Sequence, residues 1–160
     1  MRRSFVEHYI SPRRHFRKAV KKPRRPIGLV SQRVAAIGRG ILAFIGVRRA
    51  DTEECAARLA ARVLAYRVFP DTEARMNLSV RDIGGAVLLV PQFTLAADTK
   101  KGTRAGFSTA AAPPQAQRLF EHLLGCAQRA YAPVSAGVFG ADMQVSLVND
   151  GPVTFWLETR

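Results

Sequence analysis

The residues best suited to chemistry stand in two short segments, and the first of them is Pro91–Leu95. In this Pro-Gln-Phe-Thr-Leu segment, Gln92 and Thr94 alternate with apolar residues directly after an apolar run. A strand that ends in this way leaves backbone N–H groups and a hydroxyl at the rim of a sheet, and rims next to loops often carry binding groups. The segment therefore indicates either a functional rim or simply the end of a strand.

The second segment is Asn149–Val153, with the sequence Asn-Asp-Gly-Pro-Val between two apolar runs. Glycine followed by proline at such a place predicts a sharp reversal of the chain. About 5–6% of X–Pro bonds in folded proteins are cis, and a cis bond would give the turn a distinctive direction. The residues alone leave open whether this turn does more than reverse the chain.

Side-chain acid–base catalysis has few candidates in this chain. Its histidines are His8, His15 and His122, so a Ser-His-Asp arrangement in the body of the protein would have to use His122. The chain has no His-Glu-x-x-His sequence, no EF-hand loop and no P-loop. We expect no metal and no other cofactor. Judged by side-chain type alone, Thr94 is the candidate nucleophile.

Two helices and several strands must position these segments. Asp51–Glu54 has the spacing of a capped helix start, and apolar residues then recur at i, i+3 and i+4, which predicts a helix that closes near Val68 to Pro70. Pro113 and Pro114 suit the first turn of a second helix with an apolar stripe. Apolar or alternating runs predict strands over the ranges Ile27–Ser31, Val34–Ile37, Ile41–Val47, Met76–Val80, Ala86–Phe93, Val134–Phe139, Met143–Val148 and Val153–Leu157.

The order of these elements predicts an antiparallel α+β domain or barrel with two main helices. Residues 96–114 have no periodicity, and a loop of that length in a compact domain is usually functional. We therefore predict that this stretch is a binding loop.

Composition and cysteine content narrow the class of protein. A chain of 160 residues that is 48% apolar and 23% charged is expected to build one globular core. Its longest apolar run, Gly40–Val47, is far shorter than the roughly 20 residues that cross a bilayer, so we expect no membrane span. Cys55 and Cys126 have no Cys-x-x-Cys spacing, which favours core thiols in a reducing compartment.

Positive charge is concentrated at the start of the chain. Residues 1–25 contain ten Lys or Arg and one Glu, a net charge of +9 out of +13 for the whole chain. A short basic segment on a mildly basic body is typical of proteins with a polyanionic partner such as nucleic acid. The alternative is a solvated extension. We divide the chain into a basic, poorly ordered extension at residues 1–15 and a single domain at residues 16–160.

Several motifs together resemble the D-aminoacyl-tRNA deacylase family in order and spacing. The resemblance extends from about Gly38 to Leu157, and it includes Asp51–Glu53 and Arg75–Ser79. The segments that carry it most specifically are Gln-Phe-Thr-Leu at 92–95, Ala-Asp-Thr-Lys-Lys-Gly at 97–102, Phe-Ser-Thr-Ala at 107–110, Phe-Gly-Ala-Asp-Met-Gln-Val at 139–145 and Asn-Asp-Gly-Pro-Val at 149–153.

The resemblance implies a homodimer with a β-barrel-like α/β fold. It implies hydrolysis of the ester that joins a D-amino acid, or glycine, to the 3′ adenosine of tRNA, with rejection of L-aminoacyl-tRNA. The partners would be aminoacyl-tRNA and a second copy of the chain, without a membrane, and the location would be cytoplasmic.

The resemblance also implies roles for particular residues. Gly151 and Pro152, joined by a cis bond, would project main-chain carbonyls into the pocket of the other subunit and leave no room for an L side chain. The backbone N–H of Phe93 would face the substrate carbonyl as an oxyanion-type donor. The 2′-hydroxyl of the RNA would largely activate the water, which agrees with the shortage of histidine.

The substrate itself would be held by four further residues. Gln92, Phe139 and Met143 would bind the terminal adenine through hydrogen bonds and apolar packing. Ala116, at the start of the second helix, would line the substrate cavity.

This chain departs from the family pattern in two places. The family motif begins with Ser where this chain has Pro91, which removes a hydroxyl and a backbone donor. The family's first strand aligns either by count with Lys21–Pro23, where Lys22 would replace an arginine that braces the Gly-Pro pair, or by letters with Gln32–Val34. We prefer the alignment by count, because the alignment by letters deletes a hairpin and would expose strand edges.

These departures keep other functions open. One alternative is a catalytically impaired homologue that binds tRNA or another RNA. A second is a related editing domain with a different preference for chirality or amino acid, which the Asn-Asp-Gly-Pro-Val motif disfavours.

Overall fold

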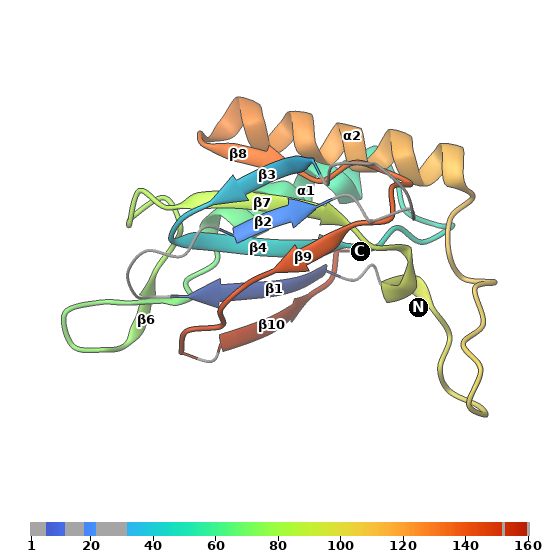
Figure 1. Ribbon diagram of the computed structural model, residues 1–160, viewed down its shortest axis with the longest axis horizontal. Helices are drawn as coiled ribbons and strands as arrows, with labels where there is room; N and C mark the ends of the chain where they lie inside the picture. Colours follow the sequence, from blue (N-terminus) through green and yellow to red (C-terminus); the bar gives the residue numbers. More distant parts are fainter. Residues whose placement is uncertain (1–5, 12–17, 22–31, 152, 160) are drawn as a thin grey trace.

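The computed structural model describes residues 6–11, 18–21, 32–151 and 153–159. Its elements run in the order β1 Val6–Ser11, β2 Lys18–Lys21, β3 Arg33–Ile37, β4 Gly40–Ile45, α1 Glu53–Ala65, β5 Phe69–Pro70, β6 Met76–Leu78, β7 Ala86–Pro91, the 3-10 helix η1 Phe93–Ala96, α2 Pro113–Ala130, β8 Val134–Ala136, β9 Gln144–Ser146 and β10 Val153–Leu157 (Figure 1).

The largest sheet has five strands in the order β10-β1-β4-β7-β8. Strand β1 is antiparallel to both of its neighbours, whereas β4, β7 and β8 are parallel to one another. Each parallel pair is joined through a helix, α1 between β4 and β7 and α2 between β7 and β8, because parallel neighbours need a long crossover. The prediction of two main helices is confirmed, but the prediction of antiparallel sheets is wrong for these three strands.

Two smaller sheets complete the strand pairing. Strands β3, β2 and β9 form an antiparallel sheet in the order β3-β2-β9, and β5 pairs with β6. Among the described residues the five-stranded sheet has β10 and β8 as its edges, and these two strands do not pair with each other. The described fold is therefore a layered mixed α/β structure, and its pairing does not close a barrel.

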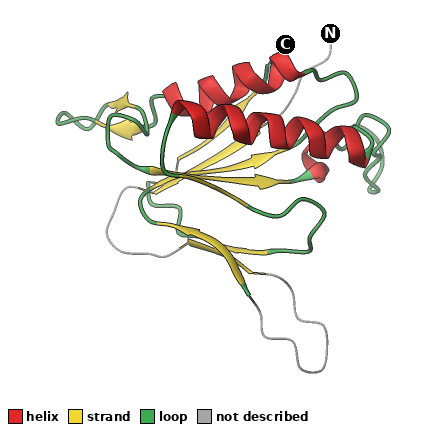
Figure 2. Cartoon of the chain, turned by 90° about the horizontal axis from the view of Figure 1, so that it is seen from above, coloured by secondary structure: helices red, strands yellow, loops and turns green. Residues whose placement is uncertain are grey.

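The layers follow from the burial of the two central strands on both faces. Figure 2 shows α1 and α2 side by side on one face of the five-stranded sheet, with other strands beyond the opposite face. Alternate residues of β4 and β7 pack into two separate apolar clusters, Ile41, Ala43, Ile45, Val87 and Leu89 with the helices, and Leu42, Leu88 and Val90 with β3 and the β9 region. Burial on both faces explains why these strands read as continuous apolar runs rather than alternating ones.

The helices start where the sequence predicted. The side chain of Thr52 caps α1 by accepting a hydrogen bond of 3.3 Å from the N–H of Cys55, and Pro113 begins α2. The first helix is shorter than expected, since Phe69 and Pro70 form β5 instead. The ring of Phe69 is fully buried, so tertiary packing explains the change from helix to strand. No described helix is long and apolar enough to cross a membrane.

The N-terminal segment contributes strands to both larger sheets. Val6–Ser11 lies between β10 and β4, inside the range for which we expected an extension, and Lys18–Lys21 pairs with β3 and β9. The preferred alignment put Lys21–Pro23 on the first strand, but the first described strand is Val6–Ser11 and Lys21 ends the second one, whereas Lys22 and Pro23 lie outside the described residues. The expected strand Ile27–Ser31 and most of the basic extension lie outside the described residues.

Candidate active site

Three parallel strands end at one edge of the large sheet, and most of the expected site residues follow these ends. Ile45 is the register partner of Pro91, and Leu89 is the partner of Ala136, so β4, β7 and β8 finish side by side. In open α/β sheets, ligands bind at the carboxyl ends of parallel strands. This edge, formed by the residues that follow β4, β7 and β8, is called the carboxyl edge below.

At the carboxyl edge, the segment after β7 turns sharply into η1. The N–H of Gln92 still pairs with the carbonyl of Ile45 at 2.8 Å, and the 3-10 turn begins at the next residue. The first N–H groups of a helix have no acceptor within it, and no described residue supplies one for the N–H of Phe93. This N–H is therefore available to a ligand.

A glycine makes room for this turn. A Cβ at Gly46 would lie 2.7 Å from the Cβ of Leu95 and 3.3 Å from the carbonyl oxygen of Gln92. Real Cβ atoms do not approach another carbon so closely, so only glycine lets η1 lie directly against the end of β4.

The hydroxyl of Thr94 has an amide, not a base, as its partner. The side-chain Nε2 of Gln92 donates a hydrogen bond of 2.6 Å to Oγ1 of Thr94. An amide NH₂ group has only donor hydrogens and cannot take up the hydroxyl proton. The contacts of Thr94 thus give a nucleophilic threonine no general base.

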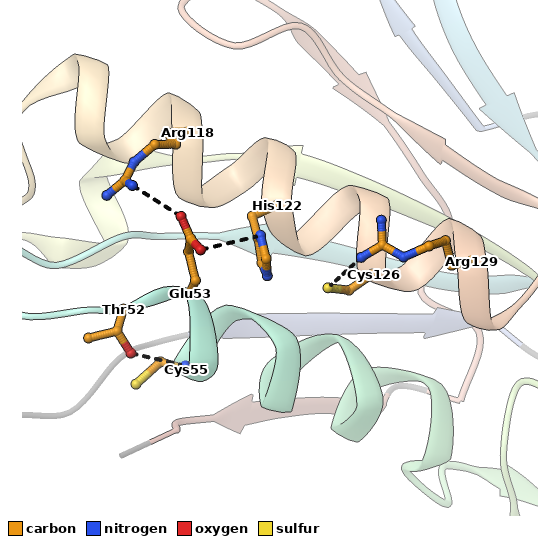
Figure 3. A network of polar contacts seen from close by, with 7 residues as sticks. All are labelled: Thr52, Glu53, Cys55, Arg118, His122, Cys126 and Arg129. Carbon is orange, nitrogen blue, oxygen red and sulfur yellow. Dashed lines mark hydrogen bonds and ion pairs between the residues drawn. The ribbon is translucent and has the colours of Figure 1, made fainter.

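His122, which a Ser-His-Asp arrangement would have required, lies in the contact between the two helices. Its Nδ1 is 4.0 Å from Oε2 of Glu53, and Oε1 of Glu53 also pairs with Nη1 of Arg118 at 3.0 Å (Figure 3). These groups link α2 to the first turn of α1. The geometry assigns His122 to helix packing.

The residues expected around an adenine are only partly brought together. A Cβ at Gly137 would lie 2.9 Å from Sδ of Met143 and 3.4 Å from Cδ of Pro91, so the methionine packs at the carboxyl edge against Gly137. The ring of Phe139 instead packs against Phe120 of α2, with ring centroids 6.4 Å apart. Met143 and Phe139 therefore belong to the two different apolar clusters.

Ala116 lies in the first turn of α2, where its N–H bonds to the carbonyl of Ala112 at 2.9 Å. The residue is 7% exposed, so its methyl group packs inside the protein and offers a ligand little surface.

The turn before β10 presents its glycine outward. Gly151 is exposed and has a φ of 146°, a backbone conformation that is essentially restricted to glycine. Oδ1 of Asn149 accepts a hydrogen bond of 3.2 Å from the N–H of Val153, which ties together the two ends of the turn. Pro152 lies outside the described residues.

The metal-ligand and thiol groups are dispersed in the part of the chain that the structure describes. No three His, Cys, Asp or Glu side chains there lie close enough to hold a metal ion together. Cys55 and Cys126 are free and half-buried, so they are less enclosed than the core residues that we predicted. Burial raises the pKa of the Cys55 thiol, but hydrogen bonds involving Thr52 and Arg58 lower the pKa below its ordinary value overall.

The sequence matches known proteins over most of its length. Residues 26–158 match the sequence model of the D-Tyr-tRNA(Tyr) deacylase family. A D-aminoacyl-tRNA deacylase of Alkalilimnicola ehrlichii is 64% identical over 127 residues, which cover 79% of this chain and 85% of the relative. The namesake of Vibrio cholerae El Tor is 60% identical over 126 residues, with 78% and 86% covered. The chain belongs to the D-aminoacyl-tRNA deacylase family.

Two solved structures share the fold of the chain. A structure titled "c-Myc DNA Unwinding Element Binding Protein" is 31% identical, with a TM-score of 0.84 over 98% of this chain and 99% of the other. A probable eukaryotic D-amino acid tRNA deacylase is 17% identical, with a TM-score of 0.69 over 98% of each chain, and this likeness supports the fold alone. The resemblance inferred from the motifs is confirmed.

For this member of the D-aminoacyl-tRNA deacylase family, sequence reasoning missed two features of the carboxyl edge. One is Gly46, whose signal was a glycine directly after a continuous apolar run. The other is Phe107, whose ring lies 5.2 Å from that of Phe93 although 14 positions separate them. Phe107 stands in the Phe-Ser-Thr-Ala motif, but nothing local in the sequence indicates its partner.

Proposed function

We propose that the chain hydrolyses the ester bond between a D-amino acid, or glycine, and the 3′ adenosine of tRNA, and that it rejects L-aminoacyl-tRNA. The observation that carries this proposal is the identity of about 60% to curated D-aminoacyl-tRNA deacylases over most of both chains. The geometry at the end of β7 supports it, because that edge offers an unpaired main-chain donor, the N–H of Phe93, rather than a catalytic triad. Such a reaction belongs to the cytoplasm, where charged tRNA is used.

In the proposed mechanism, the N–H of Phe93 stabilises the oxyanion that forms when water attacks the ester carbonyl. The bond to the ribose oxygen then breaks, and that oxygen leaves with a proton. A donor that is fixed by the fold and unpaired before substrate binds is suited to this task, since it needs no rearrangement as charge develops. The 2′-hydroxyl of the RNA would assist the water, because Thr94 is hydrogen-bonded to an amide and His122 lies between the two helices, 4.0 Å from Glu53.

Adenine binding is assigned to the residues around the end of β8. The side chains of Met143 and Pro91 both lie against Gly137, and Gln92 follows Pro91 in the chain, so an apolar surface and an amide come from neighbouring residues. Phe139 would have to contact the adenine from the neighbouring apolar cluster. Ala116 would form part of the wall of the substrate cavity. These four residues remain proposed ligands of the adenosine and its ester.

Chirality would be enforced by the backbone of a second subunit. In the proposed homodimer, the carbonyls of Gly151 and Pro152 from each subunit occupy the space that an L side chain would need in the site of the other. The exposure and the positive φ of Gly151 support this role, since the turn presents its main chain outward. A filter made of backbone atoms depends on the fold rather than on one side chain.

The deciding experiment compares hydrolysis of a D-aminoacyl-tRNA and of its L counterpart by the purified protein. We expect selective hydrolysis of the D ester. Binding of tRNA without hydrolysis of either ester would favour the impaired RNA-binding homologue, and hydrolysis of the L ester would favour an editing domain of other specificity.

Two variants test the site within the same assay. Gly151→Ala should reduce D-ester hydrolysis at least tenfold, because alanine at this φ is strained by about 1–3 kcal/mol. Thr94→Ala should retain most of the activity. Loss of turnover in a folded Thr94→Ala protein would make a side-chain nucleophile the better hypothesis, and D-selective activity from a species that sediments as a monomer would exclude the cross-subunit filter.

A further inference from the structure

The loop Asp98–Thr109 is firmly attached at its base. The backbone groups of Asp98 and Gly106 exchange two hydrogen bonds, of 2.7 and 2.9 Å. The hydroxyl of Thr109 donates to the carbonyl of Ala96, and the carbonyl of Thr109 accepts from the N–H of Arg49 at 3.1 Å. Both ends are thus held at the carboxyl edge, and the rest of the loop projects away from the sheets (Figure 1).

The projecting part carries positive charge. Lys100, Lys101 and Arg104 are exposed, and none of them has an ion pair with a described residue. The carboxylate of Asp98 accepts a hydrogen bond of 3.1 Å from the backbone N–H of Lys100 rather than from an ammonium group. Three cations therefore remain available for an anionic partner.

Two aromatic rings join this loop to the candidate site. Phe93 is 61% exposed and Phe107 is 44% exposed, and their ring centroids lie 5.2 Å apart with a tilt of 47°. The two rings contact each other, but each still exposes apolar surface to water. Because the N–H of Phe93 is the proposed oxyanion donor, Phe107 lies one aromatic ring away from the reacting ester.

We propose that the loop Asp98–Thr109 binds the single-stranded nucleotides that precede the terminal adenosine of the RNA substrate. Phe107 stacks with a base, and Lys100, Lys101 and Arg104 contact the phosphates. This inference rests on the proposed function, since it places the remainder of the 3′ strand next to the ester. The proposal gives a role to the ring of Phe107 and to the three cations, which the hydrolysis itself does not use.

The chemistry favours a single strand over other partners. An aromatic platform combined with cations along a backbone is the usual way to bind unpaired nucleic acid, because every unstacked base has a π-face. A duplex would present phosphates but no free base to Phe107. An acidic protein partner would pair with the three cations but would offer the exposed ring of Phe107 no base to stack on.

The test uses two substrates, a D-aminoacyl-tRNA and the D-aminoacyl ester of adenosine alone, which lacks the upstream nucleotides. Phe107→Leu keeps an apolar side chain but removes the ring. We expect the ratio of kcat/KM for the tRNA to kcat/KM for the adenosine ester to fall about tenfold, which is within the effect of a base–aromatic stack. An equal loss on both substrates would show that Phe107 acts only by supporting Phe93, and an unchanged ratio would also overturn the proposal.

A charge variant with a matched control addresses the phosphates. Lys100→Ser with Lys101→Ser should reduce the slope of log KM for the tRNA against log salt by about 0.7 for each lost contact. Arg67→Ser with Arg81→Ser removes two exposed cations from the segment that precedes β7. This segment lies at the amino end of β7, away from the carboxyl edge, so the double variant should leave that slope unchanged. Equal slopes for the two double variants would contradict the proposal.

A binding measurement separates this inference from the proposed function. An uncharged RNA hairpin with a short single-stranded 3′ extension should bind the wild-type chain more tightly than a blunt hairpin, and Phe107→Leu should remove the difference. This result supports the loop even if neither ester is hydrolysed, which would overturn only the proposed function. Equal binding of both hairpins, or binding of neither, would overturn the role of the loop.

Discussion

The two ends of the parallel strands β4 and β7 are built in different ways. At the amino end, the hydroxyl of Tyr131 donates to the carbonyls of Gly85 and Val80, at 2.5 and 3.2 Å, and Gly85 and Val80 are themselves bonded to each other. At the carboxyl edge, the N–H of Phe93 has no acceptor among the described residues, and the ring of Phe93 is largely exposed.

The difference separates stability from function within the same strands. Groups that are saturated with contacts inside the chain fix the arrangement of the strands and have nothing left to offer a ligand. Groups that remain unpaired at the carboxyl edge contribute little to folding and are available to a substrate. We therefore expect substitutions at the amino end to change the free energy of unfolding and substitutions at the carboxyl edge to change turnover.

The largest expected effect concerns turnover and the main chain of Phe93. Phe93→Pro removes the N–H at the first position of η1, where proline is well tolerated by a helix. Loss of one oxyanion donor should lower kcat for D-aminoacyl-tRNA about 10²- to 10³-fold. Phe93→Ala is the matched control, because it also lacks the ring but keeps the N–H. Equal values of kcat for the two variants would exclude this donor.

The largest expected effect on stability is at Gly40. A Cβ there would lie 1.8 Å from the carbonyl oxygen of Ala86, so β4 and β7 would have to separate. We expect Gly40→Ala to destabilise the fold by about 3 kcal/mol, the upper part of the usual range for overpacking. Gly38→Ala, in the turn that precedes β4, meets no atom within 4 Å and serves as the control. Thermal unfolding of both variants checks this, and similar melting temperatures would contradict it.

A smaller loss is expected at Tyr131. Tyr131→Phe removes the donor to two carbonyls of buried residues, Gly85 and Val80, and should lower the free energy of unfolding by about 1–2 kcal/mol. Urea denaturation measures this difference. Phe93→Ala, at the carboxyl edge, should change stability by no more than about 0.5 kcal/mol. A larger loss of unfolding free energy for Phe93→Ala than for Tyr131→Phe would contradict the proposed difference between the two ends of the strands.

The smallest effect depends on pH and lies in the turn before β7. Hydrogen bonds from the side chain and the backbone of Ser79 lower the pKa of Asp82 below its usual range. A lowered pKa in the folded state stabilises the protein above the unfolded pKa, about 3.9, and this stabilisation is lost as the pH falls through the folded pKa. The advantage of wild type over Asp82→Asn, measured by urea denaturation, should therefore be constant near neutral pH and shrink on acidification below about pH 4. An advantage that grows in acid would refute this assignment.

Local signals were sufficient for much of the fold. The cap at Thr52, the proline at position 113 and the apolar stripes placed both helices, because these features act within one or two turns of chain. The continuous apolar runs placed β4 and β7 for a similar reason. Local signals were not sufficient for Phe69, whose burial in the core turned the expected end of a helix into a strand.

The sequence placed several expected site residues at the end of a strand, but it did not show how their side chains are arranged. The motifs pointed to Gln92, Phe93 and Thr94, and the structure places them at the carboxyl edge. The hydrogen bond between Gln92 and Thr94 and the separation of Phe139 from Met143 were not visible in the sequence. Both depend on side-chain packing, which no spacing rule describes.

What the sequence by itself determined is the two helices, the central strands β4 and β7, the family motifs and the shortage of residues for acid–base catalysis, because composition, periodicity and short motifs are local properties. Only the tertiary structure decided that β4, β7 and β8 are parallel, that β1 lies between β10 and β4, and that the rings of Phe93 and Phe107 meet. These outcomes depend on the free energy of contacts between distant segments, which outweighs any local preference once the helices have packed on the sheet.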